Sequence, residues 1–254
     1  MFDCHVHSNF STDCKEDIIN IIEKGKKDNV GITVTDHMDL NYPDLNLFRF
    51  NVDEYLKKYW PLRNDKFCVG IELGMGDEIK EENNELVKNY NFDQIIGSIH
   101  MIQGNDIFQK ETYREKSKRE VYEKYFSSME MCIRTHEYIN ILAHIDYISR
   151  YSTYNDTEIW YREFSDYIDE VLKRIIERDI ALELNTRRFN SNSAIKNTFD
   201  ILKRYKELGG VLITLGSDSH TASSVGNNFF KAKDLVKNME LKNVYYRCRK
   251  IQDL

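Results

Sequence analysis

The chain has 254 residues, of which 41% are hydrophobic and 31% charged, and its formal net charge is −6. This length and composition suffice for one large α/β domain, or two small ones, with a sizeable buried core. A mildly acidic chain is a poor general ligand for nucleic acid, because such binding depends largely on neutralising phosphates. A local basic pocket for one small phosphate remains possible.

Cysteine usage and the termini indicate the compartment. The five cysteines are odd in number and scattered, with no Cys-x-x-Cys pair. This pattern favours a reducing compartment and argues against both a disulfide framework and a thiolate zinc site. The N-terminus lacks a basic-then-apolar signal segment, and no run is long and apolar enough to cross a membrane. We therefore expect a cytoplasmic protein with no membrane partner.

Predicted strands and helices alternate along the chain. After an opening strand that ends near His7, strands are expected at residues 31–35, 67–74, 93–99, 139–143, 180–185 and 211–215. Helices are expected at residues 16–27, 52–59, 79–90, 110–134, 158–178, 194–207 and 227–239, followed by a short strand or tail at residues 244–246. Such alternation predicts a parallel sheet wrapped by helices. About seven β-α units favour a closed or nearly closed barrel over a doubly wound sheet, and the absence of a linker predicts one domain over residues 1–254.

The opening segment carries two histidines one residue apart, His5 and His7. In an extended strand, alternate side chains point to the same side, so these imidazoles would project together. Asp13 adds a carboxylate a few residues later. This set could begin a metal site but is too small to complete one, and two polar residues at a strand end remain the alternative.

The other histidines follow the same pattern. Six of the seven lie at or just beyond the carboxyl ends of predicted strands: His5, His7, His37, His100, His144 and His220. Only His136 lies elsewhere, late in a charged helix, where we expect a solvated surface position. Parallel α/β folds gather the carboxyl ends of their strands at one rim, where such enzymes build their sites. Since Asp13, Glu72 and Asp218 fall at the same edges, the sequence predicts a metal centre there.

The donor types limit the metal and its chemistry. Imidazole and carboxylate without thiolate suit zinc, iron or manganese and do not separate them. Nine candidate ligands are too many for one ion and suit a cluster of two or three. Such clusters lower the pKa of a bound water and hold both ends of an in-line displacement at phosphorus.

Together these motifs resemble the PHP superfamily, named for polymerase and histidinol phosphatase domains. The resemblance spans nearly the whole chain in the family's order and rests on His5-x-His7-Ser8-x-x-Ser11-x-Asp13, Thr35-Asp36-His37, Gly97-Ser98-Ile99-His100, His144-x-Asp146 and Gly216-Ser217-Asp218-x-His220. Within the superfamily, residues 144–150, 183–187 and 214–220 are most similar to the stand-alone histidinol-phosphate phosphatases.

The resemblance implies a distorted (β/α)7 TIM-like barrel with three divalent ions. One ion would be held by His5, His7, Glu72 and Asp218. Glu72 would bridge to a second ion on His100 and His144, while Asp13, His37 and His220 would hold the third. The family's phosphate anchors map to Arg150 and Arg187, with Arg188 less favoured. Asp36 and Glu183 are expected to orient imidazoles.

The expected activity is that of a metal-dependent phosphomonoesterase acting on a small phosphorylated substrate, L-histidinol phosphate. A hydroxide bridging the first two ions would attack phosphorus in line, and the third ion, helped by Asp218 or His220, would stabilise the departing alkoxide. Segment 38–49, with Tyr42, Phe48, Asp39 and Asp44, is a candidate lid whose acids could attract the substrate's ammonium group.

Three alternatives remain at this stage, besides a phosphatase of another small ester. A PHP-type phosphodiesterase or nuclease is disfavoured because the only basic run, residues 116–119, is flanked by Glu115 and Glu120 and is expected to be a solvated helix face. A metal-stabilised binding module would have lost catalysis, although every ligand position matches. An amidohydrolase-type barrel would be expected to offer a metal-bridging lysine late in a strand, and none is a candidate. The oligomeric state stays open.

Overall fold

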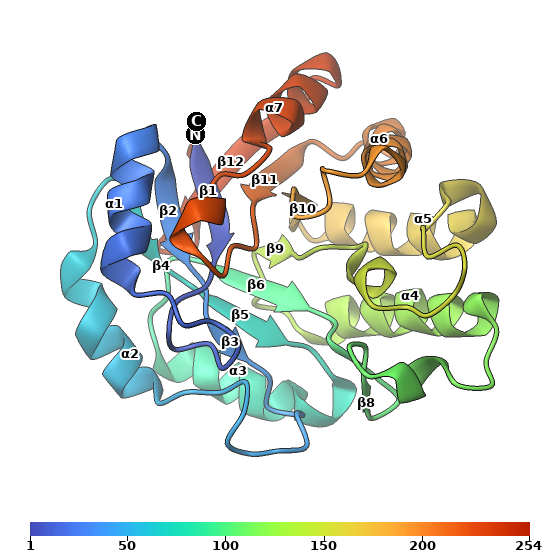
Figure 1. Cartoon of the computed structure of the whole chain (residues 1–254), viewed down its shortest axis with the longest axis horizontal. Coiled ribbons are helices and arrows are strands. Elements are labelled where there is room, and N and C mark those ends of the chain that lie inside the picture. Colours follow the sequence, from blue (N-terminus) through green and yellow to red (C-terminus); the bar gives the residue numbers. More distant parts are fainter.

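The structure, a computed structural model, describes all residues from 1 to 254 and contains seven α-helices and thirteen strands (Figure 1). The strands are β1 (Phe2–Val6), β2 (Gly31–Val34), β3 (His37–Met38), β4 (Phe67–Val69), β5 (Ile71–Gly74), β6 (Ile95–Ser98), β7 (Met101–Ile102), β8 (Asn105–Asp106), β9 (Ile141–Leu142), β10 (Ala181–Asn185), β11 (Leu212–Gly216), β12 (Lys242–Arg247) and β13 (Lys250–Asp253). The helices are α1 (Ile18–Asp28), α2 (Val52–Tyr59), α3 (Lys80–Asn89), α4 (Lys118–Thr135), α5 (Tyr161–Glu177), α6 (Asn192–Glu207) and α7 (Phe229–Asn238).

The strands form two main sheets with parallel pairing throughout their central parts. One sheet has the order β13-β12-β11-β10-β9-β6-β5-β3 and the other the order β1-β2-β4. Only the β12–β13 and β7–β8 pairs are antiparallel. Parallel strands connected by helices make a mixed α/β fold, as the sequence predicts.

Backbone hydrogen bonds connect the two sheets along β1 and β11. The amide of His7 donates to the carbonyl of Ser219, and the amide of Asp218 donates to the carbonyl of His5, each at 2.8 Å. On the other side, β2 passes into β3 and β4 into β5 after short irregular breaks, so the ends of the small sheet run on into the large one. The carboxyl ends of β1, β3, β5, β6, β9 and β11 therefore come together.

The helices surround the strands and cover their outer surface (Figure 1). Their apolar faces pack on strands that are buried along most of their length, and one connected core of 53 buried residues results. Local signals in the sequence set the helix starts: Asp17 caps α1 by accepting from the amide of Ile19, and Ser117 and Glu120 form a capping box on α4. No helix combines the length and apolar character needed to span a membrane.

Two expectations about local structure are wrong, and a third is confirmed. The region 110–134 is not one helix, because the Ser117 cap starts α4 at Lys118 and a separate 3-10 turn occupies Lys110–Tyr113. The strand expected near residues 244–246 is present as β12, which is longer than expected and forms a hairpin with β13. Lys118 does not face solvent freely, since it pairs with Asp156 and Glu163.

His136 is fully buried, not solvated as its charged neighbours suggest. It caps the end of α4, and its Nδ1 lies 3.0 Å from the carbonyl oxygen of Cys132. A helix leaves its last carbonyls without internal partners, and a histidine after the last turn can satisfy one of them. The residue therefore serves helix termination and lies outside the histidine cluster described next.

Candidate metal centre

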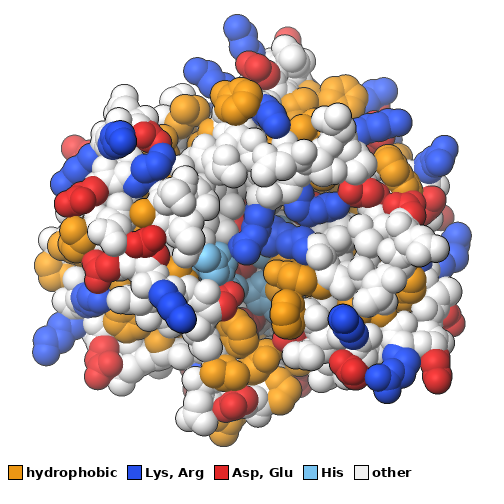
Figure 2. All heavy atoms as spheres, viewed as in Figure 1, with side chains coloured by type: hydrophobic (Ala, Val, Ile, Leu, Met, Phe, Trp, Pro, Cys, Tyr) orange, Lys and Arg blue, Asp and Glu red, His pale blue; other side chains and the backbone are white.

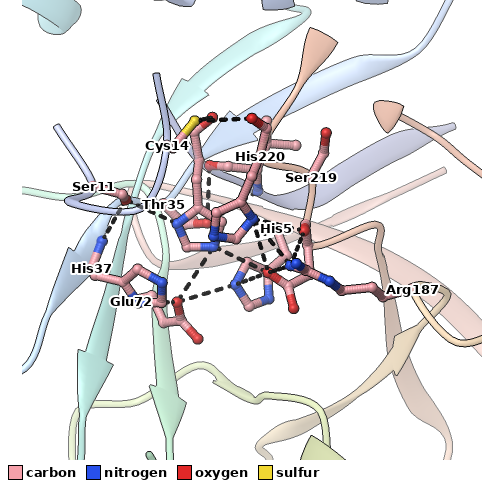
Figure 3. A network of polar contacts seen from close by, with 12 residues as sticks. His5, Ser11, Cys14, Thr35, His37, Glu72, Arg187, Ser219 and His220 are labelled. Carbon is pink, nitrogen blue, oxygen red and sulfur yellow. Dashed lines mark hydrogen bonds and ion pairs between the residues drawn. The ribbon is translucent and has the colours of Figure 1, made fainter. Parts of the chain in front are cut away.

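Nine side chains predicted as metal ligands meet at the carboxyl ends of the strands. The opening strand β1 brings His5 and His7, β3 begins with His37, and β5 contains Glu72. The segments that follow β1, β6, β9 and β11 supply the others: Asp13, His100, His144, Asp218 and His220. Figure 3 shows His5, His37, His220 and Glu72 turned toward one another from separate elements. The structure thus brings together all nine residues.

Glu72 lies at the centre of this cluster and has no exposed surface. Its Oε2 is 3.3 Å from His5 Nε2, 3.5 Å from His7 Nε2 and 2.8 Å from His37 Nδ1. Its Oε1 is 3.0 Å from His144 Nε2 and 3.4 Å from His100 Nε2. One carboxylate thus presents each oxygen to a different group of imidazoles, which is the arrangement of a bridging ligand.

The donor atoms fall into groups whose members lie within 4.8 Å of one another. These groups are His5, His7 and Asp218; His5, Glu72 and His144; His7, His37 and His220; and His37, Asp39 and His100. Asp13 extends the third group, because its Oδ2 is 3.0 Å from His220 Nε2. The grouping agrees with the expected division in keeping His5, His7 and Asp218 together and His37 with His220. It differs for His100, which groups with His37 and Asp39, while His144 groups with His5 and Glu72.

Buried polar atoms without a hydrogen bond show whether the residues of the cluster fit a metal. The Nε2 atoms of His5, His7 and His100, the Nδ1 atoms of His37 and His144, and Glu72 Oε2 are all buried without a hydrogen-bond partner. Glu72 Oε2 lies within 3.5 Å of three of these nitrogens, but none of the contacts has hydrogen-bond geometry. Since buried polar atoms are nearly always hydrogen-bonded, six such atoms in one cluster call for a cationic partner. Imidazole and carboxylate donors of this kind fit zinc and related divalent ions.

The charges in the cluster perturb one another strongly. Burial alone would raise the pKa of Glu72, but the imidazoles of His5, His37 and His100 outweigh it and hold that pKa well below its usual value. Burial lowers the pKa of His37, yet Glu72 and Asp13 outweigh it and raise this pKa to about 9. In contrast, burial and the neighbouring imidazoles of His220 and His37 keep the pKa of His7 well below normal. Without cations, the cluster therefore relies on mutual neutralisation between carboxylates and imidazoles.

Hydrogen bonds fix the far ring nitrogen of three of these imidazoles. Glu183 Oε1 is 2.7 Å from His5 Nδ1, and Asp39 Oδ1 is 2.8 Å from His100 Nδ1. Ser11 Oγ is 3.0 Å from His7 Nδ1. A carboxylate that accepts a hydrogen bond from one ring nitrogen keeps the proton on that nitrogen, so the other nitrogen is unprotonated and can bind a metal.

Asp36 does not contact an imidazole, contrary to expectation. Its Oδ1 accepts from the amide of Ser8 and from the amide and hydroxyl of Ser11, and its Oδ2 accepts from the Ser8 hydroxyl. Because Ser11 in turn touches His7, Asp36 shapes the loop after β1 and acts on the ligand indirectly. Asp3, which the sequence analysis missed, supports the segment after β11 in a similar way, because it accepts from the amide and hydroxyl of Ser217. The available signal was a carboxylate within a buried strand.

The three arginines have different environments. Arg150 is buried and donates to Asp218 Oδ2 and to Asn185 Oδ1, and its Nε has no partner. Arg187 is partly exposed, and its Nη1 lies 2.9 Å from the carbonyl of Asp218 and 3.1 Å from His220 Nδ1. Arg188 is held by Asp146 and Glu158. Arg150 and Arg187 therefore border the cluster, and Arg188 stabilises the surrounding structure.

A cavity of about 280 Å³ opens beside the cluster. Its lining includes His37 and His100 together with Tyr42 and Phe48 of the expected lid. Asp44 of the same segment is exposed and outside the lining, so its expected contact with substrate is not supported. Figure 2 shows histidines at the base of a central hollow, with basic side chains on one border and hydrophobic side chains on another.

Comparison with known proteins agrees with this geometry. The chain is 50% identical over 249 residues to a probable histidinol-phosphatase of Clostridium acetobutylicum, covering 98% of both chains. It is 31% identical to a histidinol-phosphatase of Lactococcus lactis, covering 92% of this chain and 90% of that one. The crystal structure of a Lactococcus lactis histidinol phosphate phosphatase, complexed with zinc, L-histidinol and phosphate, superimposes with a TM-score of 0.92 at 30% identity, covering 99% and 98% of the two chains.

A family match covers the part of the chain that contains most of the cluster. Residues 3–187 match the PHP domain, which includes every candidate ligand except Asp218 and His220. Sequence, fold and the arrangement of histidines lead to the same assignment. The chain belongs to the PHP domain family.

Proposed function

We propose that this protein is a metal-dependent phosphomonoesterase that hydrolyses L-histidinol phosphate to L-histidinol and phosphate, a step of histidine biosynthesis. The observation that carries the proposal is the buried cluster around Glu72 with two guanidinium groups at its edge. The relatives named histidinol-phosphatase, which align over nearly the full chain, support this substrate.

We assign the nine residues to three divalent ions. The first would be held by His5, His7, Glu72 and Asp218, the second by Glu72, His100 and His144, and the third by Asp13, His37 and His220. Bound there, divalent ions supply Lewis acidity and lower the pKa of a coordinated water. Zinc is supported by the Lactococcus lactis structure, and the donor set also accommodates iron or manganese.

The chain's own groups would orient the phosphate. We assign Arg150 and Arg187 to its oxygens, because a guanidinium offers parallel N–H donors that match them. Both arginines contact Asp218, so phosphate would lie beside that carboxylate. Asp218 and His220 would then be nearest the leaving oxygen, because Arg187 Nη1 lies 2.9 Å from the Asp218 carbonyl and 3.1 Å from His220 Nδ1. Fixed charges of this kind stabilise a highly charged transition state.

The remaining assignments concern architecture and location. We propose that β11, β1, β2/β3, β4/β5, β6, β9 and β10 form a distorted seven-stranded barrel in one domain, supported by the hydrogen bonds between β1 and β11. All five cysteines are free, which supports a reducing, cytoplasmic location. The cavity's small volume supports a small phosphorylated partner over nucleic acid.

A substrate panel tests the proposal. Purified zinc-loaded protein would be assayed with L-histidinol phosphate, glucose 6-phosphate, a nucleoside monophosphate and a phosphodiester. We expect kcat/KM for histidinol phosphate to exceed the others by about 100-fold or more. Similar rates on all monoesters would refute the substrate, and faster turnover of the diester would refute the reaction class.

Metal removal separates the enzyme from a metal-stabilised binding module. Chelation should abolish turnover, and added zinc should restore it, while circular dichroism follows the fold. Full activity in a preparation shown to be free of divalent metal would contradict the proposal.

A further inference from the structure

The cavity beside the cluster differs in character from the arginine side. It is lined by five aromatic residues, by Gln109 and by three carboxylates outside the central Glu72, and neither lysine nor arginine lines it. The aromatic residues are Tyr42, Phe48, Phe108, Tyr147 and Tyr151. Its volume of about 280 Å³ is near the lower limit of small-molecule sites, about 300 Å³. An acidic, aromatic pocket of this size suits a small cationic or ring-bearing group.

Only one of the three carboxylates is without a cationic partner. Asp13 Oδ2 lies 3.0 Å from His220 Nε2, and Asp39 Oδ1 lies 2.8 Å from His100 Nδ1. Asp106 forms no ion pair: its Oδ1 accepts from the amide of Phe108 at 2.8 Å, and the Tyr42 hydroxyl also interacts with its carboxylate. Its side chain is therefore the one of the three carboxylates whose charge no cationic group offsets.

The hairpin β7–β8 fixes Asp106 relative to the metal centre. β7 starts directly after His100, and Asp106 pairs with Met101 across the hairpin. The amide of Ile107 donates to the carbonyl of His100 at 2.9 Å, which ties the second strand to the candidate ligand. The turn at Gln103 and Gly104 has positive φ at both residues, as tight two-residue hairpins require. The carboxylate is thus held in place before any ligand arrives, which reduces the entropic cost of binding.

Aromatic rings extend from the candidate ligands to Asp106. The Tyr147 ring centroid is 4.9 Å from that of His100 and 5.2 Å from that of Tyr151, which in turn is 5.2 Å from Phe108. Aromatic faces stack on planar rings and attract cations. A ligand with its phosphate at the metal centre would reach Asp106 by passing along these rings.

We propose that Asp106 is a specificity-determining residue whose carboxylate binds the ammonium group of the substrate's alcohol portion, while the aromatic residues hold its ring. The site selects phosphate esters of cationic amino alcohols over neutral esters. This inference rests on the phosphatase function proposed above and adds the group that recognises the leaving alcohol.

The test compares Asp106→Asn with a matched control, Asp44→Asn. Asp106→Asn keeps an oxygen for the backbone amide of Phe108, while it removes the negative charge and replaces the other oxygen by an NH2 group. Asp44 accepts from the amide of Asn46 in the same way but is exposed and outside the cavity. Zinc-loaded proteins would be assayed with L-histidinol phosphate, O-phosphoethanolamine, which has the cation without the ring, and phenyl phosphate, which has a ring without the cation.

We expect Asp106→Asn to lower kcat/KM about 10- to 100-fold for both cationic esters, mainly through KM, and to leave phenyl phosphate within about twofold. Asp44→Asn should change none of the three. Unchanged kinetics with the cationic esters, or an equal loss with all three, would overturn the role of Asp106. Wild-type protein that hydrolyses phosphoethanolamine and phenyl phosphate but not histidinol phosphate would refute the proposed substrate. The role of Asp106 would still be tested in that case, by comparing the ratio of kcat/KM for these two esters between Asp106→Asn and the wild type.

Discussion

Replacement of Glu183 by glutamine tests how the hydrogen bonds behind the cluster control metal binding. Glu183 is buried, its Oε1 is 2.7 Å from His5 Nδ1, and its Oε2 accepts from the amide of His144 at 2.6 Å. Glutamine has the same shape but replaces one acceptor oxygen by an NH2 donor. If that NH2 faces His144, two donors confront each other. If it faces His5, the imidazole must accept there and carry its proton on Nε2, the nitrogen 3.3 Å from Glu72.

Either orientation loses a hydrogen bond to the charged carboxylate, by opposing two donors at His144 or by reversing the bond to His5, and such a bond contributes about 1.5–3 kcal/mol. At about 1.4 kcal/mol per tenfold change, zinc affinity should fall about 10- to 100-fold, the range typical for groups that orient metal-bound histidines. The assay is a zinc titration against a competing chelator, with kcat/KM measured at saturating zinc.

Glu158→Gln provides a matched control. Glu158 is also buried and bonds to Arg188, Ser193 and Asn197, none of them a candidate ligand. It should lower the free energy of unfolding without changing zinc affinity. Zinc affinity in Glu183→Gln equal to that of the wild type, with the fold intact, would refute the reasoning.

Two further predictions concern the arginines and Asp36. Arg187→Ala should raise KM for histidinol phosphate about 10- to 100-fold, with nearly unchanged zinc content by elemental analysis. Arg150→Ala should raise KM and also reduce zinc content, because it leaves Asp218 without its buried partner. Equal zinc loss in both variants would contradict this difference. Asp36→Asn should lower the free energy of unfolding by about 1–3 kcal/mol in urea titrations, since Asp36 accepts four hydrogen bonds from Ser8 and Ser11; an unchanged unfolding midpoint would remove it from the loop's support.

Sequence alone was sufficient for the chain's family, the alternation of its strands and helices, and nine of the residues at the cluster, although it missed Asp39. Strands and helices follow from local apolar periodicity, and strand ends in a parallel fold share one rim. Position along the chain thus predicted that His5, His100 and Asp218 would meet. Their assignment to individual ions and the catalytic roles of Asp218 and His220 stay predictions, as does closure of the barrel.

The tertiary structure decided which groups support that cluster and which remain free. Asp39 engages His100 across 61 residues, and Asp3 holds Ser217 across 214. The local sequence marks Asp3 as a carboxylate within an apolar strand, but it does not show which donor folding brings beside Asp3 or Asp39. The burial of His136 has the same origin. Local pattern predicted the candidate ligands, while long-range pairing determined their hydrogen-bond partners and which carboxylate of the cavity has no cationic partner.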